Sequence, residues 1–267
     1  MSGELIDRVK DEIARSGFPL ELRTGAQFAS AGFDVRHSSY YIDRDENKGR
    51  EIDIVAQSYA EMGDRGMLGI TCVVECKKSV HPWVAFSTPR APWMTAFGLV
   101  HNRRGLPTLK HSPTSTLALA RAFHFHDAKR VGRSFMETHS KGMDGSGPFY
   151  SAIMSVCKAA SHEIDQSRPD GEYVLGDQPD LQLYLPTVVV EGRLFEAWLD
   201  GGVLQTEERE HIVVEQNYMS AKYRRSGAVV DVVTESGLPS HIETIKATWK
   251  RVQQTVRLDI DHFFPRK

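Results

Sequence analysis

Two short stretches decide the fold: residues 50–56 read REIDIVA, and residues 73–79 read VVECKKS. Both contain runs of β-branched residues, which favour strands, and a polar segment separates them. Because side chains alternate between the two faces of a strand, Glu75 and Lys77 share one face, and Cys72, Val74 and Cys76 point to the other, apolar face. Asp53 stands between two isoleucines. If the two strands pair, two carboxylates and one ammonium group meet.

Other elements extend outward from this pair of strands. A period of 3.6 in the apolar residues predicts helices over residues 3–16, 20–31, 115–126, 148–164 and 240–256. Alternating or β-branched runs predict strands over residues 33–42, 51–57, 69–77, 183–190, 193–199, 211–216 and 228–234. The pair Glu191-Gly192 is interpreted as a hairpin turn. This order of elements predicts an α/β fold, with a mixed β-sheet flanked by helices.

The length and composition predict one domain. The chain has 267 residues, of which 40% are hydrophobic and 25% charged, and this is enough for one elaborated α/β domain with a buried core. We expect a single domain over residues 1–267, with its core in about 3–84 and 146–267. Residues 85–145 are rich in proline, glycine and histidine and are predicted to be a loop-rich insertion.

Cysteine content and hydropathy bear on the compartment. The three cysteines include no Cys-x-x-Cys pair, which argues against a disulfide framework and a structural zinc knot of cysteines. No apolar run reaches the roughly 20 residues that a membrane span needs, and the first residues carry no signal-peptide pattern. We therefore expect a cytoplasmic protein without a membrane association.

The net charge of −2 means that the chain as a whole lacks the positive excess common in nucleic-acid binders. Its basic residues are nevertheless clustered, so one positive face remains compatible with the sequence. The clusters lie at residues 101–104, 129–133, 222–225 and 246–257.

The acids and the lysine on the paired strands predict a divalent-metal site. Burying such charges is costly unless they pair or bind a cation, and Mg²⁺ prefers carboxylate oxygens together with water and phosphate oxygens. We expect Asp53, Glu75 and the backbone carbonyl of Cys76 to hold Mg²⁺, with Mn²⁺ as the alternative ion. Lys77 is expected to position or help deprotonate the attacking water and to offset charge in the transition state. This chemistry is hydrolysis of a phosphodiester.

An acid on one strand followed by Glu-x-Lys on the next resembles the PD-(D/E)XK nuclease superfamily. The resemblance covers about residues 18–84, although Ile52 replaces the proline for which the family is named. It implies a restriction-endonuclease-like core with additional C-terminal strands and a helix, and a metal-dependent nuclease in which a metal-bound water attacks in line. Glu21 occupies the place of the family's helical glutamate, so the resemblance implies a fourth catalytic residue beside Asp53, Glu75 and Lys77.

The resemblance also implies a nucleic-acid partner, with DNA expected in preference to RNA and basic clusters contacting phosphates. A monomer and a homodimer both remain open. Two other functions remain open on the same fold. One is a catalytically silent or partner-dependent nucleic-acid-binding module, and the other is a protein-interaction module.

His124 and His126 are two further candidate ligands, for a second kind of metal site. They fall in a predicted helix, where residues two apart do not share a face, and no cysteine or acid is spaced to complete a site. We interpret them as ordinary surface or half-buried histidines.

Overall fold

The protein was analysed as a computed structural model, which describes residues 2–62, 67–91, 100–102, 113–138, 147–166, 181–216, 220–223 and 228–263. The helices are α1 (Ser2–Arg15), α2 (Phe18–Ser30), α4 (Pro113–Ala122), the 3₁₀ helix η2 (His124–Asp127), α5 (Pro148–Gln166) and α6 (Leu238–Phe263). The strands are β1 (Asp34–Asp43), β2 (Lys48–Glu61), β3 (Met67–Lys78), β4 (Trp83–Pro89), β5 (Val100–Asn102), β6 (Arg130–Glu137), β7 (Leu181–Glu191), β8 (Leu194–Asp200), β9 (Val203–Glu208), β10 (His211–Gln216) and β11 (Ala228–Thr234).

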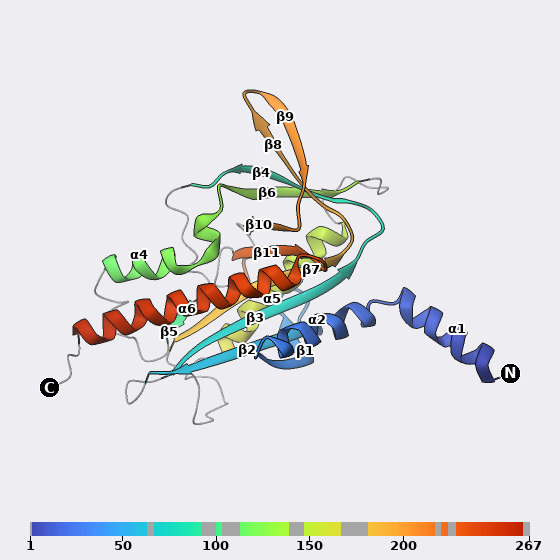
Figure 1. Cartoon of the computed structure of the whole chain (residues 1–267), viewed down its shortest axis with the longest axis horizontal. Coiled ribbons are helices and arrows are strands. Elements are labelled where there is room, and N and C mark those ends of the chain that lie inside the picture. The colour runs from blue at the N-terminus through green and yellow to red at the C-terminus, as the bar shows by residue number, and fades with distance from the viewer. Residues whose placement is uncertain are drawn as a thin grey trace.

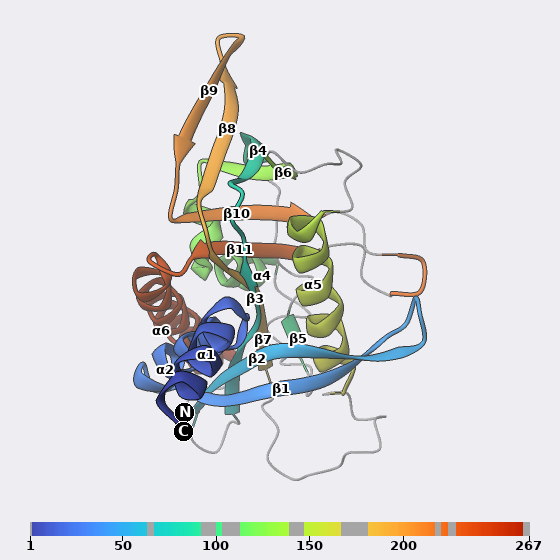
Figure 2. The same cartoon turned by 90° about the vertical axis from the view of Figure 1, so that its right-hand side faces the viewer.

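Within the described residues the strands form one mixed sheet in the order β1-β2-β3-β7-β11-β10-β6-β4-β8-β9, and β5 pairs with the first residues of β7. Helix α5 covers one face of the sheet, and α2, α4 and α6 cover the other (Figures 1 and 2). The chain is therefore an α/β protein with a mixed sheet flanked by helices, as the order of elements predicts.

The central strands are buried because helices cover both of their faces. Every residue of β11 is buried, and so is every residue of β7 except its last. On the α5 side, Trp83 is fully buried and stacks on Phe149, with 4.5 Å between ring centroids. On the other side, Trp249 and its neighbours on α6 belong to one buried apolar cluster with side chains of β3, β7 and β11. The sheet therefore separates two apolar layers.

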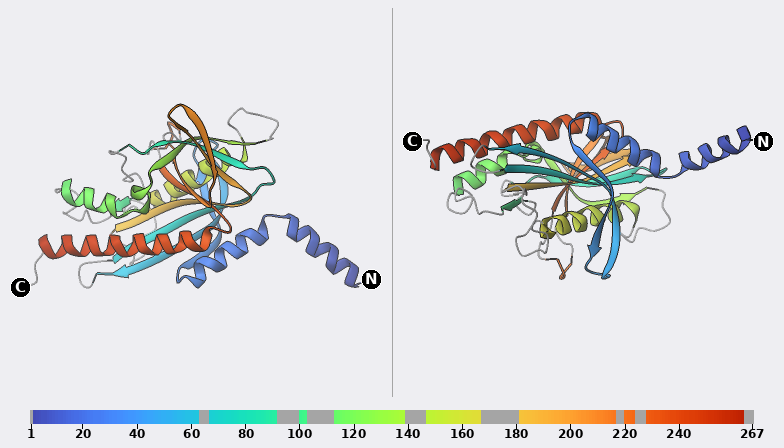
Figure 3. Two further views of the ribbon diagram at one scale, coloured as in Figure 1. Left: turned by 45° about the horizontal axis from the view of Figure 1, so that its top comes forward. Right: turned by 90° about the horizontal axis from the view of Figure 1, so that it is seen from below.

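Helix α1 lies apart from the sheet and projects away from it (Figures 1 and 3). Its predicted apolar stripe, Leu5, Ile6, Val9 and Ile13, is 46–62% exposed. None of the helices in the described parts of the chain is both long and apolar enough to cross a membrane.

The predicted hairpin around Glu191-Gly192 is wrong. β7 pairs with β3 and β11, whereas β8 leaves the turn to pair with β4 and β9. Strand β8 instead forms a hairpin with β9 through Gly201 and Gly202, whose φ angles are 56° and 85°. Two consecutive positive φ angles fit a tight hairpin turn, which glycine adopts without strain.

The predicted loop-rich insertion is more regular than expected where the structure describes it. Strands β4 and β6 pair antiparallel inside the main sheet, and α4 packs against α6. The expected helix over 115–126 is divided into α4 and the 3₁₀ helix η2. Strands β4, β5, β6 and β9 had no predicted counterpart. These strands are short and carry many polar residues, so tertiary pairing outweighs their weak local pattern.

Candidate active site

Three of the predicted site residues meet where β2 and β3 stop pairing. The β2–β3 register ends at Ile54 opposite Val74, so Asp53 and Glu75 are the next residues of their strands. The backbone N–H of Cys76 donates a hydrogen bond to Asp53 Oδ2 at 2.6 Å, and Lys77 Nζ lies 2.5 Å from Glu75 Oε1. Two carboxylates and an ammonium group therefore gather at the end of this ladder.

Glu21 reaches the same place from another element. It lies in the first turn of α2 and is half-buried. Burial raises its pKa, and the negative charge of Asp53 raises it further while Lys77 opposes the rise. Such mutual electrostatic effects require proximity. The structure thus brings Glu21 near the other three groups from a helix that precedes both strands.

The site's electrostatics are unfavourable without a cation. Burial raises the pKa of Glu75 to about 7, and the neighbouring Asp53 carboxylate adds to the rise. Burial also raises the pKa of Asp53, although the Cys76 N–H opposes this. For Lys77, burial acts to lower the pKa, but the Glu75 carboxylate outweighs it and the net shift is upward. The repulsion falls on the two groups predicted to bind metal.

The donor atoms fit a divalent cation. Glu75 is only 5% exposed, and its Oε2 atom is buried without a hydrogen-bond partner. A cation between Asp53 and Glu75 would give that oxygen a partner and relieve the repulsion. The carbonyl of Cys76, the third predicted ligand, points to the same side of β3 as its N–H, as in any strand, and therefore toward Asp53. The set is oxygen-rich, which suits Mg²⁺ or Mn²⁺.

Backbone strain accompanies this site on the neighbouring strand. The β1–β2 register passes from His37–Ile54 to Ser39–Ile52, and Ser38, opposite Asp53, has a φ of 53°. Positive φ is uncommon for residues other than glycine and often occurs near functional sites. The side-chain alternation of β2 is also interrupted at Asp53, since Ile52 packs on the α5 side of the sheet and Ile54 on the α2 side.

Many residues of the predicted basic clusters already have acidic partners. Arg130 pairs with Glu196 at 2.8 Å, Arg133 with Glu215, and Arg251 with Asp127 at 3.2 Å. Residues 103–104 and 224–225 of these clusters lie outside the described residues. The expected phosphate contacts remain a prediction, and the observed ion pairs reduce the free positive charge available for them.

A second cluster of polar groups lies between α6 and strands β10 and β11. His124, His211, Asp231 and His241 each offer one ligand atom, and these atoms lie within 4.8 Å of one another. The Nε2 atoms of His124 and His211 lie 3.0 and 2.8 Å from Asp231 Oδ1. The interpretation of His124 as a surface or half-buried residue is therefore wrong, because it is 7% exposed and contacts a buried acid.

His241 differs from the other members because neither of its ring nitrogens has a hydrogen-bond partner, although the side chain is 1% exposed. A buried polar group without a partner costs about 1–3 kcal/mol. Burial lowers the pKa of His241 to about 3, which outweighs the nearby Asp231 carboxylate, so its ring is neutral.

Asp231, His211 and His241 were not among the site residues predicted from the sequence. Asp231 was the available signal, since it is the single charge in the apolar strand AVVDVVT and a buried acid needs a partner. The partners of Asp231 could not be predicted because they come from three other elements, η2, β10 and α6.

No family model, curated protein or solved structure matches this chain. The functions proposed for the two sites are therefore argued from the residues of this chain and their geometry.

Proposed function

We propose that the protein is a divalent-metal-dependent nuclease with a restriction-endonuclease-like core, which hydrolyses phosphodiester bonds in DNA in preference to RNA. The observation that carries the proposal is the meeting of Asp53, Glu75 and Lys77 at the open end of the β2–β3 ladder. The nearby Glu21, placed by α2, supports it further. These are the four residues that the resemblance to PD-(D/E)XK nucleases implies.

The electrostatics support metal-dependent chemistry over a structural ion pair. A surface ion pair gains little and leaves no buried atom without a partner. Here, Lys77 pairs with Glu75 and its charge also acts on the pKa of Asp53, and Glu75 Oε2 has no hydrogen-bond partner. Strongly perturbed carboxylates in such an arrangement are typical of functional sites.

Asp53 and Glu75 would hold the ion, and the Cys76 N–H keeps the Asp53 carboxylate oriented toward β3. When bound, a divalent ion supplies Lewis-acid polarisation of the phosphate and activation of the attacking water. Lys77 places a positive charge beside Glu75, where it orients the attacking water and offsets charge on the phosphorus-centred transition state. Glu21 supplies a further carboxylate at the rim, which would anchor Lys77 or a second ion.

Purified protein, incubated with supercoiled, linear and single-stranded DNA and with RNA in Mg²⁺, Mn²⁺ or EDTA, tests the proposal. We expect DNA cleavage in Mg²⁺ or Mn²⁺ and none in EDTA. Asp53→Ala and Lys77→Ala should each lower the rate at least about 100-fold. Lys78→Ala is the matched control, because Lys78 is the adjacent lysine but pairs with Glu191 at 2.8 Å, and it should retain activity.

Cleavage that persists in both Asp53→Ala and Lys77→Ala would exclude this site as the catalytic centre. Nucleic-acid binding without cleavage, unchanged in both variants, would favour the silent binding module. A stable complex with a protein and no affinity for nucleic acid at low salt would favour the interaction module.

A further inference from the structure

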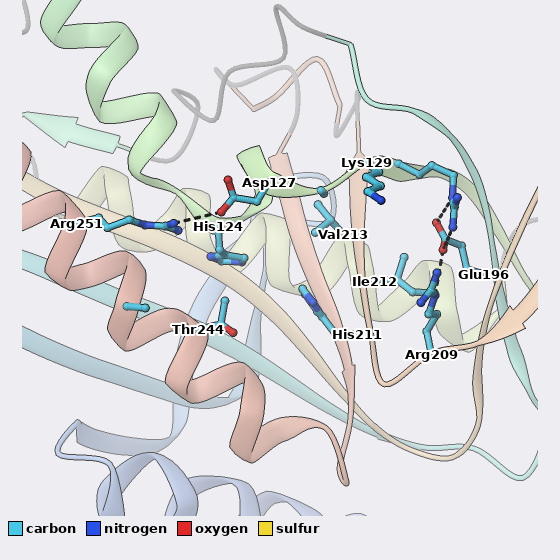
Figure 4. A pocket seen from close by; sticks show the side chains of 13 residues that line it. His124, Asp127, Lys129, Glu196, Arg209, His211, Ile212, Val213, Thr244 and Arg251 are labelled. Carbon is cyan, nitrogen blue, oxygen red and sulfur yellow. Dashed lines mark hydrogen bonds and ion pairs between the residues drawn. The ribbon is translucent and has the colours of Figure 1, made fainter.

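We propose that His124, His211, Asp231 and His241 form a structural zinc site, distinct from the candidate active site and independent of any nuclease activity. The four residues come from η2, β10, β11 and α6, and their ligand atoms lie within 4.8 Å of one another. Figure 4 shows His124 and His211 projecting into the space between α6 and the strands.

The register of the sheet brings two of these side chains together. β10 pairs antiparallel with β11, with Val213 opposite Asp231 and His211 opposite Val233. Val213, Val229 and Val233 pack in the apolar layer under α6. Because side chains alternate along a strand, His211 and Asp231 point into the same layer. Helix α6 lies over this layer and supplies His241.

The donor set selects the class of metal. Three imidazole nitrogens and one carboxylate oxygen suit zinc, whereas Mg²⁺ and Ca²⁺ prefer sites made of oxygen. Zn–N and Zn–O bonds of about 2.0–2.2 Å place neighbouring ligands of a tetrahedron about 3.3–3.6 Å apart. The distances from Asp231 oxygens to the three Nε2 atoms are 2.8–3.9 Å, a range that brackets this ligand–ligand distance. Four protein ligands make the closed coordination typical of a structural site.

His241 separates a metal site from a plain hydrogen-bond network. In a network without metal, Asp231 accepts hydrogen bonds from His124 and His211, and this satisfies the acid. This network does not include His241, whose two ring nitrogens are buried without a hydrogen-bond partner. Its Nε2 lies 3.9 Å from Asp231 Oδ2, too far for a hydrogen bond but suitable for two ligands of one ion.

His124 also has the outer partner that metal-binding histidines usually have. Its Nε2 faces Asp231, and its Nδ1 lies 3.2 Å from the hydroxyl of Thr248. Thr248 is fully buried and lies further along α6 than His241. A hydrogen bond from Nδ1–H fixes the tautomer in which Nε2 is free to bind metal. Thr248 and His241 lie on the same helix, so α6 supplies a ligand and an outer partner.

A cavity of about 490 Å³ beside the cluster provides a path for the ion (Figure 4). His124 and His211 both line it, and His211 is the ligand with the most exposed side chain, at 31%. The other ligand side chains are at most 5% exposed. Zinc can therefore enter past His211 and remain shielded from solvent once it is bound.

The test measures metal content and coordination in the wild-type protein and in substituted proteins. We expect one zinc per chain, and zinc X-ray absorption with nitrogen and oxygen ligands at about 2.0–2.2 Å and no sulfur near 2.3 Å. Removal of zinc with a chelator should lower the melting temperature, and added Zn²⁺ should restore it. Mg²⁺ should not restore it.

Two variants and two controls assign the ligands. His211→Gln changes the most exposed ligand and should keep the fold. It should lower zinc affinity at least about 10-fold, because even the loss of a partner that only hydrogen-bonds to a ligand lowers metal affinity by that factor. His241→Ala should lose zinc. His126→Ala is the matched control, because His126 is a half-buried histidine of the same 3₁₀ helix outside the cluster, and it should keep zinc. Asp53→Asn should also keep zinc, which separates this site from the candidate active site.

Wild-type protein that binds no zinc would overturn the proposal, and so would sulfur ligation in the absorption spectrum. Equal zinc affinity in wild-type protein, His211→Gln and His241→Ala would overturn it as well. If His241→Ala does not fold, the wild-type spectrum and the His211→Gln affinity still decide.

Discussion

The backbone N–H of Cys76 donates a hydrogen bond of 2.6 Å to the carboxylate of Asp53. This contact ties an acid on β2 to the strand that carries Glu75 and Lys77. It replaces the next rung of the ladder, which ends at Ile54 and Val74. The two strands therefore part at the point where the site needs room for an ion and a phosphate.

Glu75→Gln should change the pH dependence of stability. The pKa of Glu75 is about 7 in the folded chain and 4.5 as its ordinary value, so the folded state binds more protons between these pH values. The free energy of unfolding therefore falls as pH rises from 4.5 to 7. Thermal unfolding in EDTA should show this fall in wild-type protein, on the order of 1–3 kcal/mol, and a smaller fall in Glu75→Gln. Mg²⁺ should reduce it in the wild type.

The control for this prediction is Glu61→Gln, which changes an exposed glutamate at the far end of the strand that carries Asp53 and should preserve the pH dependence. The same change of stability with pH in wild-type protein and Glu75→Gln would show that Glu75 is not the group whose pKa is raised in the folded chain.

Lys158→Met should destabilise the protein because Lys158 holds a buried acid. Its Nζ lies 2.9 Å from Asp43 Oδ2 and 2.8 Å from Asp45 Oδ2, and the Asp43 side chain is 3% exposed. Removing one partner of a buried pair costs about 3–5 kcal/mol. Lys246→Met, which removes an exposed lysine paired with Glu243, should cost less than about 1 kcal/mol. Urea unfolding of both variants gives the comparison.

The ion pairs of Lys158 with Asp43 and Asp45 also predict that the stability of the protein falls in acid. Burial acts to raise the pKa of Asp43, but the hydrogen bonds from Lys158 and from the Asp45 N–H, together with the Lys158 charge, outweigh it and the net shift is downward. A carboxylate with a lowered folded-state pKa stabilises the fold above its ordinary value of 3.8 and loses this contribution as pH falls through its folded-state pKa. The loss should disappear in Lys158→Met, and an unchanged acid transition would contradict this assignment.

Ser38→Gly tests the strain opposite Asp53. Glycine adopts the φ of 53° without the cost of about 1–2 kcal/mol that a side chain brings, although it loses about 0.5–1 kcal/mol through greater freedom in the unfolded chain. We expect a variant that is as stable as wild type or slightly more stable. Ser39→Gly, one residue along the same strand, should be destabilising by about 0.5–1 kcal/mol. Equal losses in the two variants would be the contrary result.

Gly192→Ala should disturb the turn that carries β8 away from β7. A Cβ atom at Gly192 would lie 2.7 Å from the backbone carbonyl oxygen of Ser79, which directly follows β3 and its Lys78. The clash should cost about 1–3 kcal/mol, whereas Gly49→Ala, where no atom lies within 4 Å, should be nearly neutral. Melting temperatures of the two variants check this.

The sequence predicted the parts of the molecule in which local pattern and tertiary role agree. Strand β1 alternates and is rich in tyrosine, and β2 and β3 have β-branched runs. Alternation could therefore place Glu75 and Lys77 on one face, and the expected pairing of β2 with β3 could place Asp53 beside them. The predicted hairpin at Gly192 was wrong because β7 pairs with β3 on one side and with β11 on the other, which leaves no free edge for β8. The histidine cluster was missed because no local pattern relates His124 to residues 211–241.

The two sites differ in the length of chain that must be assembled to form them. The candidate active site uses residues 21–77, and its central contacts belong to the antiparallel pair β2 and β3, which follow one another along the chain. The histidine cluster joins residues 124, 211, 231 and 241, and is complete only when α6 lies on the sheet. Contacts between residues distant in sequence form late because closing long loops costs entropy. In refolding, the acids of β2 and β3 should come together early, and zinc retention should report that the last helix has docked.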